Sequence, residues 1–444
     1  MSYKAYGKYK ESKIKWIGEI PSTWDTIKAK HCFNLSGGYA FKSDDFIEEG
    51  IPLVRIGDIT NGTIDFNNCK RLPSEYATIM KEFLVKPGDI LIALTGATIG
   101  KIGQVPQSNE KILLNQRVGK LSSDASNYYK YILSSDLIKE QIMLIADGSA
   151  QENISNEDIG NFEIFDIDDN TKQQITTYLD KKTANIDATI AKNEELIQLL
   201  EEKRVALINQ VVTKGLNPDV SMKDSGVEWI GEIPEHWAVE KIKNISQVKP
   251  SNVDKKSKDN EPPVLLCNYT DVYNNEFITM ELDFMKATAT HDQIRKLSLD
   301  VEDIIITKDS ESADDIAVPA IVTEELENVV CGYHLAVIKP NTSIINPKFL
   351  FRSFESDRIN KQFELGANGV TRFGLGTYPI SNAYVCQPPL NEQKEIANYL
   401  DIETAKIFKA TDKILNHIEL LEEYKTSLIH HVVTGKIDVR GEEI

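Results

Sequence analysis

The sequence predicts an α+β fold in which two β-rich domains are joined by two long helices that form an antiparallel coiled coil, with an internal pseudo-two-fold repeat. Two repeats carry this prediction. An unusual Trp-bracketed phrase occurs twice, 213 positions apart, and a long heptad-patterned segment occurs twice, 221 positions apart. Between them, short apolar segments broken by turns predict strands, most clearly at 83–105 and 297–318.

The first repeat is the phrase WIGEIPSTW at residues 16–24, which returns as WIGEIPEHW at residues 229–237. A shared run this long and this rich in tryptophan indicates a duplicated unit rather than chance. We expect its tryptophans to be structural and to wedge the start of each domain against the helix pair: Trp16, Trp24, Trp229 and Trp237.

The second repeat closes each domain and predicts a helix. Asn170 and Asn391 are favourable N-caps, and Gln173 completes a capping-box pattern in the first copy. Gly215 and Gly435 stand where a helix would end, because glycine readily adopts the left-handed conformation of a helix C-terminus. The two segments therefore predict helices of matching length.

Apolar residues in both segments follow a seven-residue repeat in the same register. The a and d positions are Leu179, Ile186, Ile190, Ile197, Leu200, Leu207 and Val211 in the first copy and Leu400, Ile407, Ile414, Ile418, Leu421, Leu428 and Val432 in the second. A basic residue, Arg204 or Lys425, interrupts the a row at the same place in both. A pattern sustained over about 40 residues, or about 60 Å, favours pairing of the helices. The alternative is that each helix packs only on its own domain.

These signals divide the chain into six predicted segments. They are a first β-rich domain at 1–169, a first spacer helix at 170–214, a linker at 215–227, a second β-rich domain at 228–390, a second spacer helix at 391–435 and a C-terminal tail at 436–444. Because the offset grows from 213 to 221 between the two repeats, the second domain is longer than the first. The ends of the repeated unit are alike and the middles are not.

Composition places the chain among globular proteins of two to four compact units. Of its 444 residues, 41% are hydrophobic and 27% are charged. No run approaches the roughly 18 apolar residues of a membrane span, so we expect no membrane contact and a cytoplasmic protein. Five scattered cysteines without a C-x-x-C pair predict neither a disulfide framework nor a zinc site.

The formal net charge of −18 argues against nucleic-acid binding if it is averaged over the surface, because phosphates attract Lys and Arg. The charge is unevenly distributed, however, since residues 1–120 hold 17 Lys and Arg against 13 Asp and Glu. Charge is therefore only a weak argument against a DNA role.

No complete catalytic motif is found. The segment GATIGK at 96–101 is one residue short of a phosphate-binding loop, and Ile102 replaces its Ser or Thr. No H-E-x-x-H occurs, and the nuclease-like pair Asp180 and Lys182 lies on the first predicted helix. We therefore predict a protein that is not itself an enzyme and that binds no metal.

Several motifs, in order along the chain, resemble the specificity subunit of type I restriction-modification enzymes. They are the two Trp-bracketed phrases, VKPGDILIALTGATIGKIGQV at 85–105, QPPLNEQKEIANYL at 387–400 and VVTGKIDVRG at 432–441. The likeness covers essentially the whole chain. The second domain departs from it, because VEDIIITKDSESADDIAV replaces the Gly-rich PGDILIALTGATIGKIGQV of the first.

The resemblance implies a non-catalytic subunit whose β-rich domains are target-recognition domains and whose paired helices are a spacer. It implies that the chain binds double-stranded DNA and holds two methyltransferase subunits and, for cleavage, restriction subunits that translocate DNA. S-adenosylmethionine and ATP are then expected on those partner subunits, and no cofactor on this chain. Two similar scaffolds with unlike surfaces would recognise two different short sequences in one bipartite, asymmetric target.

Candidate DNA contacts are cationic, amide or aromatic side chains in segments that can reach a groove. Arg and Lys bind phosphates and guanine, whereas Asn and Gln suit adenine. In the first domain the candidates are Tyr39, Lys42, Arg55, Lys101, Arg117 and Gln151. In the second domain they are Lys249, Lys255, Lys256, Lys258, Tyr269, Lys308 and Arg372. For each residue the alternative is an ordinary solvated side chain.

Two other functions are compatible with parts of the sequence. A fused nuclease or methyltransferase would require a metal or methyl-donor site, which the motifs do not supply. A coiled-coil protein-interaction scaffold without direct DNA readout would require only the two heptad-patterned helices.

The modular repeat makes the first testable prediction. Replacing residues 30–165 by the corresponding region of a relative should change one half of the recognised sequence and leave the other half intact, because each domain recognises its own DNA segment. Mapping of methylated bases in cells that carry the chimaera and its methyltransferase measures both halves. A change in both halves would contradict the modular organisation.

Overall fold

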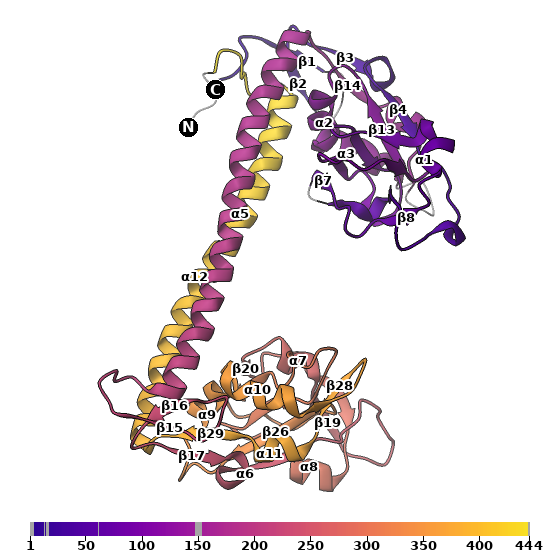
Figure 1. Cartoon of the computed structure of the whole chain (residues 1–444). Coiled ribbons are helices and arrows are strands. Elements are labelled where there is room, and N and C mark those ends of the chain that lie inside the picture. Colours follow the sequence, from indigo (N-terminus) through magenta and orange to yellow (C-terminus); the bar gives the residue numbers. More distant parts are fainter. Residues whose placement is uncertain (1–3, 13, 15–16, 61, 147–152, 443–444) are drawn as a thin grey trace. The chain divides into compact units, whose positions relative to one another are not determined.

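Two compact units, each containing one of the Trp-bracketed phrases, share one strand order. The computed structural model describes residues 4–12, 14, 17–60, 62–146 and 153–442. The first unit combines Met1–Asn193 with Asn416–Ile444, and the second is Glu194–Leu415 (Figure 1). Each long helix thus contributes one half to each unit, whereas the sequence predicts separate spacer segments.

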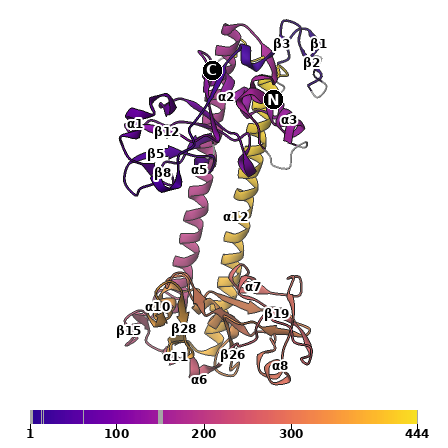
Figure 2. The ribbon, with the colours of Figure 1, turned by 90° about the vertical axis from the view of Figure 1, so that its right-hand side faces the viewer.

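A larger and a smaller sheet form the centre of the first unit. The larger sheet has the order β4-β13-β10-β11-β7-β6. Its strands are β4 (Asn34–Gly37), β6 (Ile59–Thr60), β7 (Gly62–Ile64), β10 (Ile90–Ala93), β11 (Ile102–Gln104) and β13 (Val118–Ser122). The smaller sheet has the order β8-β5-β12-β9, with β5 and β12 parallel (Figure 2). Its strands are β5 (Ile51–Val54), β8 (Lys70–Leu72), β9 (Leu84–Val85) and β12 (Ile112–Leu114). Because β10 and β12 are apolar and buried along their whole length, the core lies on them.

Short strand pairs and helices complete the first unit. The pairs are β1 (Tyr9–Glu11) with β2 (Glu19–Pro21), and β3 (Asp25–Lys28) with β14 (Glu163–Asp166). The α-helices are α1 (Tyr76–Ile79), α2 (Ser126–Ser134), α3 (Asp136–Ala146) and α4 (Asn156–Gly160). Single 3₁₀ turns are η1 (Ala29–His31), η2 (Ser43–Asp45), η3 (Ile56–Asp58), η4 (Lys81–Phe83) and η5 (Gly96–Thr98).

The second unit repeats this strand order. Its larger sheet, β18-β26-β22-β24-β20, corresponds to β4-β13-β10-β11-β7, and its smaller sheet, β21-β19-β25, contains the parallel pair β19 and β25. The strands are β18 (Ser246–Pro250), β19 (Pro263–Cys267), β20 (Phe277–Ile278), β21 (Met285–Thr288), β22 (Ile304–Thr307), β24 (Pro319–Val322), β25 (Val329–Cys331) and β26 (Leu335–Pro340). The core again lies on the central, fully buried strand, β22.

The remaining elements of the second unit include one small three-stranded sheet. It has the order β23-β28-β27, with β23 (Asp309–Ser310), β27 (Ala367–Asn368) and β28 (Phe373–Leu375). The other strand pairs are β15 (Met222–Asp224) with β16 (Glu232–Pro234), and β17 (Ala238–Lys241) with β29 (Tyr384–Gln387). The helices are α6 (Ile242–Ile245), α7 (Tyr269–Tyr273), α8 (His291–Leu297), α9 (Pro347–Phe354), α10 (Asp357–Gly366) and α11 (Thr377–Asn382).

The two long helices are α5 (Asp169–Lys214) and α12 (Leu390–Val433). The predicted N-caps are wrong. Asp168 caps α5, since its carboxylate accepts from the N–H and the hydroxyl of Thr171 at 2.9 and 2.7 Å, and Asn170 lies inside the first turn. Asn391 likewise lies inside α12, which begins directly after two prolines. No helix among the described residues is long and apolar enough to cross a membrane.

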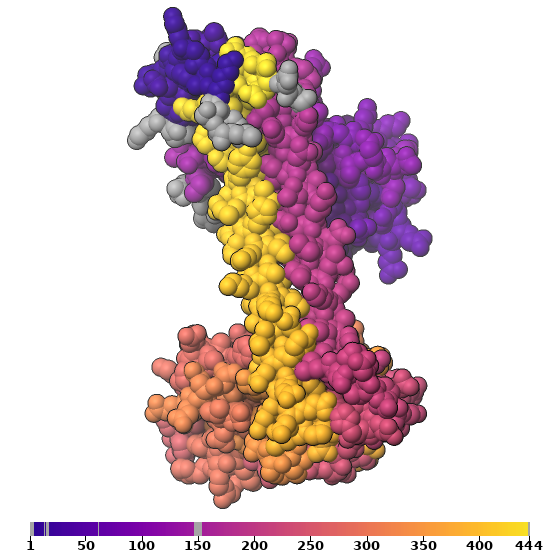
Figure 3. All heavy atoms as spheres, turned by 90° about the vertical axis from the view of Figure 1, so that its left-hand side faces the viewer, coloured from indigo at the N-terminus to yellow at the C-terminus, as the bar shows by residue number. Residues whose placement is uncertain are grey.

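Within each unit the two helices pack against each other (Figure 3). In the first unit the pairing is antiparallel, because Lys425 contacts Asp187 at 2.6 Å while the earlier His417 contacts the later Asn193 at 3.0 Å. Predicted heptad positions enter the cores of both units, namely Leu179, Ile186, Leu428 and Val432 in the first and Val211 and Leu400 in the second. The helices therefore bury the seam that the sequence predicts.

The second tryptophan of each phrase packs on the glycine that ends a helix. Trp24 and Trp237 are buried, whereas Trp229 is partly exposed and Trp16 lies outside the described residues. Gly435, after α12, has a φ of +72°, and a Cβ added to it would lie 2.5 Å from Pro21 Cδ and 3.0 Å from the Trp24 ring. Gly215, after α5, meets the Trp237 ring in the same way at 3.1 Å.

The Gly435 joint makes a prediction about stability. Gly435→Ala should destabilise the first unit by about 2–5 kcal/mol, because the new Cβ meets both a left-handed backbone and the Pro21 and Trp24 rings. Hydrogen exchange of peptides from both units measures where the protein opens. Gly441→Ala is the matched control, since its φ is +75° and no atom lies within 4 Å of the added Cβ. Equal effects of both substitutions would contradict the steric role of the joint.

Candidate nucleic-acid interface

In the first unit, candidate residues meet where the parallel strands β5 and β12 end. Arg55 follows β5, and Arg117 lies three residues beyond β12. The N–H of Tyr39 donates to the carbonyl oxygen of Leu114 at 2.9 Å, and the N–H of Gln116 donates to the Tyr39 carbonyl oxygen at 3.0 Å. Because carboxyl ends of parallel strands share one edge, the fold brings Tyr39, Arg55 and Arg117 to that edge.

The two arginines of this edge have different surroundings. The Arg55 Nε lies 3.6 Å from a carboxylate oxygen of the buried Asp58, which also accepts from the Arg55 backbone N–H at 2.8 Å. Arg117 is exposed, and its backbone is held in place because the Arg117 carbonyl oxygen accepts from the N–H of Leu94 at 3.0 Å. Arg117 is therefore the freer of the two for an anionic ligand.

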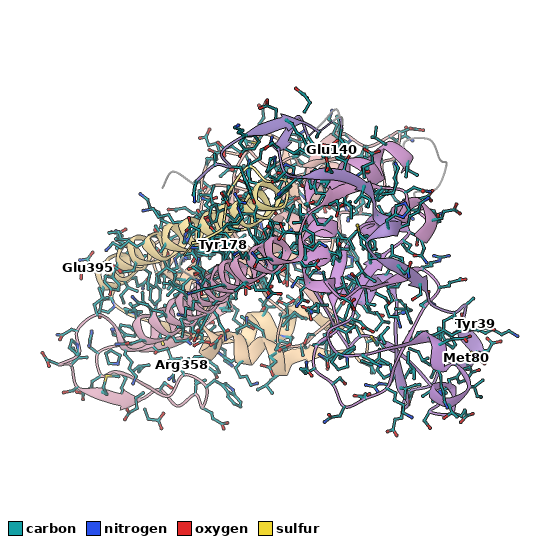
Figure 4. All side chains as sticks on the ribbon, turned by 90° about the horizontal axis from the view of Figure 1, so that it is seen from above. Tyr39, Met80, Glu140, Tyr178, Arg358 and Glu395 are labelled. Atoms are coloured by element: carbon teal, nitrogen blue, oxygen red, sulfur yellow. The ribbon has the colours of Figure 1, made fainter. Side chains whose placement is uncertain are left out.

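Tyr39 belongs to an aromatic cluster at the same edge. Its ring centroid lies 5.1 Å from that of Phe41 and 5.4 Å from that of Phe83, and 42% of the residue is exposed. Phe41 packs in turn on Tyr76, whose pKa is raised by desolvation and by its hydrogen bond to Asp45. Tyr39 and Met80 are both labelled in Figure 4, and Met80 packs with Phe41, Tyr76 and Phe83 against the small core of Leu53, Leu72 and Leu113. An exposed aromatic face of this kind can stack on a base or a sugar.

The other first-unit candidates lie around this edge or outside the described residues. Lys42 is exposed at the start of η2, and Lys101 is exposed after η5. The Lys101 carbonyl oxygen accepts from the N–H of Ala93 at 2.9 Å, so Lys101 and Arg117 flank the same end of β10. Gln151 lies outside the described residues.

A cavity of about 650 Å³ opens beside Arg117. It is lined by Ile56, Leu94, Thr95, Gly96, Gln116, Arg117, Asn153, Ile154, Ser155 and Asn156. The Thr95 hydroxyl and the Asn156 side-chain oxygen are buried here without a hydrogen-bond partner among the described residues. Unsatisfied buried polar atoms are costly, so the cavity is suited to a polar ligand group.

The second unit places different side chains at equivalent backbone positions. The N–H of Lys308 donates to the His334 carbonyl oxygen at 2.7 Å, as the N–H of Leu94 does to that of Arg117. The N–H of Tyr333 donates to the Val253 carbonyl oxygen at 2.8 Å, in the segment that replaces the Tyr39 loop. His334 thus stands where the first unit has Arg117.

Tyr269, Lys308, Lys255 and Arg372 gather around α7 and β23. The Tyr269 ring stacks on Tyr273, with centroids 5.4 Å apart and an interplanar angle of 16°. Burial and then the Asp315 charge raise the pKa of Tyr269, and the nearby Arg372 opposes this shift. Arg372 immediately precedes β28, which pairs with β23 just after Lys308.

Two of these cations are placed by neighbouring charges and rings. The Lys308 Nζ lies 5.9 Å from the centroid of the Tyr333 ring. Lys255 lies close enough to Asp271 of α7 to lower its pKa, although burial raises that pKa overall. The fold therefore assembles a mixed aromatic and cationic patch from segments far apart in the sequence.

Three second-unit candidates lie elsewhere. Lys258 forms an ion pair with Glu261 at 3.1 Å, just before the start of β19. Tyr269 follows the other end of that strand, so Lys258 lies away from the Tyr269 patch. Lys249 lies within β18 opposite Val337 and is partly buried. Lys256 is exposed in the loop between β18 and β19.

Comparison with known proteins decides the family. The family described as "Type I restriction modification DNA specificity domain" matches residues 21–198 and 234–420. The chain belongs to this specificity family. The family matches the chain twice. Each match lies mainly in one of the two units, in agreement with the repeated strand order.

Relatives along the whole length support this membership. The EcoBI type I restriction enzyme specificity subunit of Escherichia coli is 25% identical over 96% of this chain and 89% of its own length. A putative MjaX specificity subunit of Methanocaldococcus jannaschii is 24% identical over 97% and 98%. The MjaVIII specificity subunit of the same organism is 30% identical over 155 residues, which are 33% of this chain and 36% of that protein.

A solved structure shares the fold of this specificity-family chain. It is described as "Structural basis underlying complex assembly and conformational transition of the type I R-M system", and it matches with a TM-score of 0.67 and 12% identity. The match covers 93% of this chain and 98% of the solved one. The two-unit, two-helix fold predicted from the sequence is thereby confirmed.

Sequence reasoning missed Tyr273, Asp315, Tyr333 and His334 in this specificity-family chain. Tyr333 is 50% exposed, and the Tyr273 hydroxyl donates to Asp315 at 2.9 Å. A signal was available, because GYH follows the apolar strand VVC as NQR follows ILL in the first unit. Charge alone singles out Lys and Arg as DNA contacts, and it does not single out Tyr or His.

Gly38 makes a prediction about the Tyr39 edge. A Cβ added to Gly38 would lie 2.1 Å from the Leu114 carbonyl oxygen, so Gly38→Ala must push the Tyr39 loop away from β12. We expect a stability loss of about 1–3 kcal/mol, measured by chemical unfolding. Gly37→Ala is the control, because its nearest atom would lie at 3.4 Å. A Gly38→Ala protein as stable as the control would contradict this packing.

Proposed function

We propose that this chain is the DNA-recognition subunit of a type I restriction-modification complex and that it binds a bipartite, asymmetric target in double-stranded DNA. One observation carries the proposal: the two units share a strand order but present unlike side chains at equivalent positions. Arg117 corresponds to His334, and Leu94 corresponds to Lys308. Like scaffolds suit a common polymer, and unlike contacts suit two different short sequences.

The same comparison extends to the turn after the central strand. The N–H of Gly100 donates to the Ala93 carbonyl oxygen at 2.8 Å, and the N–H of Ala317 donates to the Thr307 carbonyl oxygen at 3.1 Å. Gly100 and Ala317 are therefore equivalent. Two positions earlier, the first unit has Thr98 and the second has Asp315. A hydroxyl and a carboxylate differ in their preferred base partners, which supports different half-sites.

The proposed partners are two methyltransferase subunits and restriction subunits that translocate DNA. S-adenosylmethionine and ATP would bind those subunits, and this chain would carry no cofactor. The net charge of −18 fits such an assembly, because partner subunits can provide much of the positive surface that holds DNA. The assembly described for the structural relative supports a role within a complex.

The chain is proposed to be non-catalytic. Among the described residues, no group of three or more His, Cys, Asp and Glu side chains is placed to hold a metal ion. GATIGK forms η5 and a turn between two strands instead of opening a long helix, as a phosphate-binding loop would. A pure coiled-coil scaffold is less well supported, because it would leave the aromatic and cationic groups at the strand ends without a role.

Methylation mapping tests this function. Cells that express the chain with its methyltransferase partner should carry methylated bases within one bipartite sequence. The purified chain alone, incubated with DNA and S-adenosylmethionine, should methylate nothing. Methylation without a defined sequence, or modification by the chain alone, would overturn the proposal.

Arg372 makes a prediction about the second half-site. Arg372→Ala should leave folding and assembly intact and weaken specific binding by about 1–3 kcal/mol if the guanidinium contacts a base. Affinity is measured at fixed salt for the target, for a target altered only in the second half and for random DNA.

The control for Arg372 is Lys258→Ala, which also removes one positive charge from the second unit but at the other end of β19. Relaxed discrimination in the second half with Arg372→Ala alone identifies a base contact. Uniform weakening identifies a phosphate contact, and unchanged affinities would remove Arg372 from the interface.

A further inference from the structure

His334 adopts a backbone conformation that histidine rarely takes. Its φ is +73°, in the left-handed region, at the turn between β25 and β26. Glycine or asparagine would adopt this conformation at lower cost, and Asn328 does so on the other side of β25 with a φ of +58°. Glu302 and Ala317 are left-handed in the same unit, so the contacts of the His334 ring, and not its backbone alone, indicate a role for its side chain.

The His334 ring is held on two sides. Its Nδ1 is hydrogen-bonded to a carboxylate oxygen of Asp309 in β23. The Tyr333 ring lies against it, with centroids 4.0 Å apart. The side chain is 27% exposed, so the ring is fixed while part of it faces solvent.

The Asp309 contact determines what the ring offers to a ligand. A carboxylate only accepts hydrogen bonds, so Nδ1 carries the hydrogen and Nε2 of the neutral ring is an acceptor. The groups on DNA that donate to such an acceptor in the major groove are the exocyclic amines of adenine and cytosine. The exposed Tyr333 and the Lys308 ammonium beside it provide stacking and phosphate attraction on the same surface.

We propose that His334 is a specificity-determining residue, whose Nε2 accepts a hydrogen bond from an adenine or cytosine amine in the half-site bound by the second unit. Asp309 is its positioning residue. This inference rests on the proposed function of the chain in DNA recognition. It goes beyond the general assignment, because it names a residue, an atom and a class of base. The equivalent backbone position in the first unit carries Arg117, whose guanidinium suits guanine instead.

The test compares His334→Gly with Glu302→Gly in the complex with the methyltransferase partner. Both residues are left-handed in the second unit, with φ of +73° and +69°, so both substitutions relieve the same backbone strain. His334→Gly should lower discrimination at one position of the second half-site by about tenfold or more. Glu302→Gly should change affinity for all DNA equally and leave discrimination unchanged.

The half-site of the second unit is the half that persists when residues 30–165 are exchanged. Should His334→Gly fail to fold, Asp309→Asn provides a test that leaves the left-handed residue unchanged. Asp309→Asn leaves a side chain of equal size that no longer fixes the tautomer. It should reduce discrimination at the same position as His334→Gly and at no other.

The outcomes separate the inference from the proposed function. If the unaltered complex methylates no bipartite sequence, the proposed function fails. If the sequence is bipartite but His334→Gly leaves the second half unchanged, or weakens binding to all DNA equally, the inference about His334 is overturned. A change confined to the first half would overturn it as well.

Discussion

The packing of a helix-ending glycine against a tryptophan is the constraint on which both units depend. In the second unit the glycine and the tryptophan are close in sequence, because Gly215 follows the end of α5 and Trp237 lies in the phrase that comes next. In the first unit the partners are Trp24 and Gly435, from the two ends of the chain. The first unit is therefore complete only when α12 has returned to it, and the N- and C-terminal segments belong to one core.

Contacts around the Gly435 joint hold that closure. The N–H of Asp438 donates to the Lys4 carbonyl oxygen at 2.7 Å, and the Arg440 guanidinium lies 4.4 Å from the centroid of the Tyr6 ring. Asp438 also binds Arg440 at 2.8 Å, and this arginine helps to hold the pKa of the Asp438 carboxyl below its usual range. The sequence alone gives the C-terminal tail no role. In the structure the tail packs on the N-terminal segment.

The helices are attached to their domains by different chemistry at equivalent positions. Arg352 is fully buried and contacts Asp401 of α12 at 2.9 Å, whereas the Tyr131 hydroxyl donates to Asp180 of α5 at 2.6 Å. The nuclease-like Asp180 of the sequence is therefore a helix anchor. Loss of one partner from a buried ion pair costs about 3–5 kcal/mol, so this difference makes the second attachment more dependent on charge.

Periodic features of the fold could be predicted from the sequence, and non-local ones could not. Heptads and repeats are local patterns, which is why the helix pair and its seam were predicted correctly. The N-caps were wrong because Asp168 and Asn170 have similar capping preferences and only the backbone geometry distinguishes them. The parallel pairing of β5 with β12 joins segments about 60 residues apart, and no turn signal specifies it.

The DNA contacts are a prediction from side-chain chemistry, and only the fold shows which of the candidate residues lie together. The side-chain chemistry of Tyr269, Lys308 and Arg372 makes them candidates, and the fold brings them together, whereas the cation Lys258 lies at the other end of β19. His334 was missed because its left-handed turn and its bond to Asp309 exist only in three dimensions.

On the proposed function, the two units differ in how they balance affinity against discrimination. At the turn after the central strand, the second unit carries Asp309 and Asp315 where the first has Thr95 and Thr98. A carboxylate beside DNA repels phosphates and weakens binding to every sequence, but it orients neighbouring donors and rejects bases that offer only acceptors. Specificity is a ratio of affinities, so a loss of general affinity in one unit is tolerable when the other unit, whose corresponding turn carries no carboxylate, retains it. On the proposed function, a net acidic chain can therefore recognise DNA, provided that binding is shared between two units and their partners.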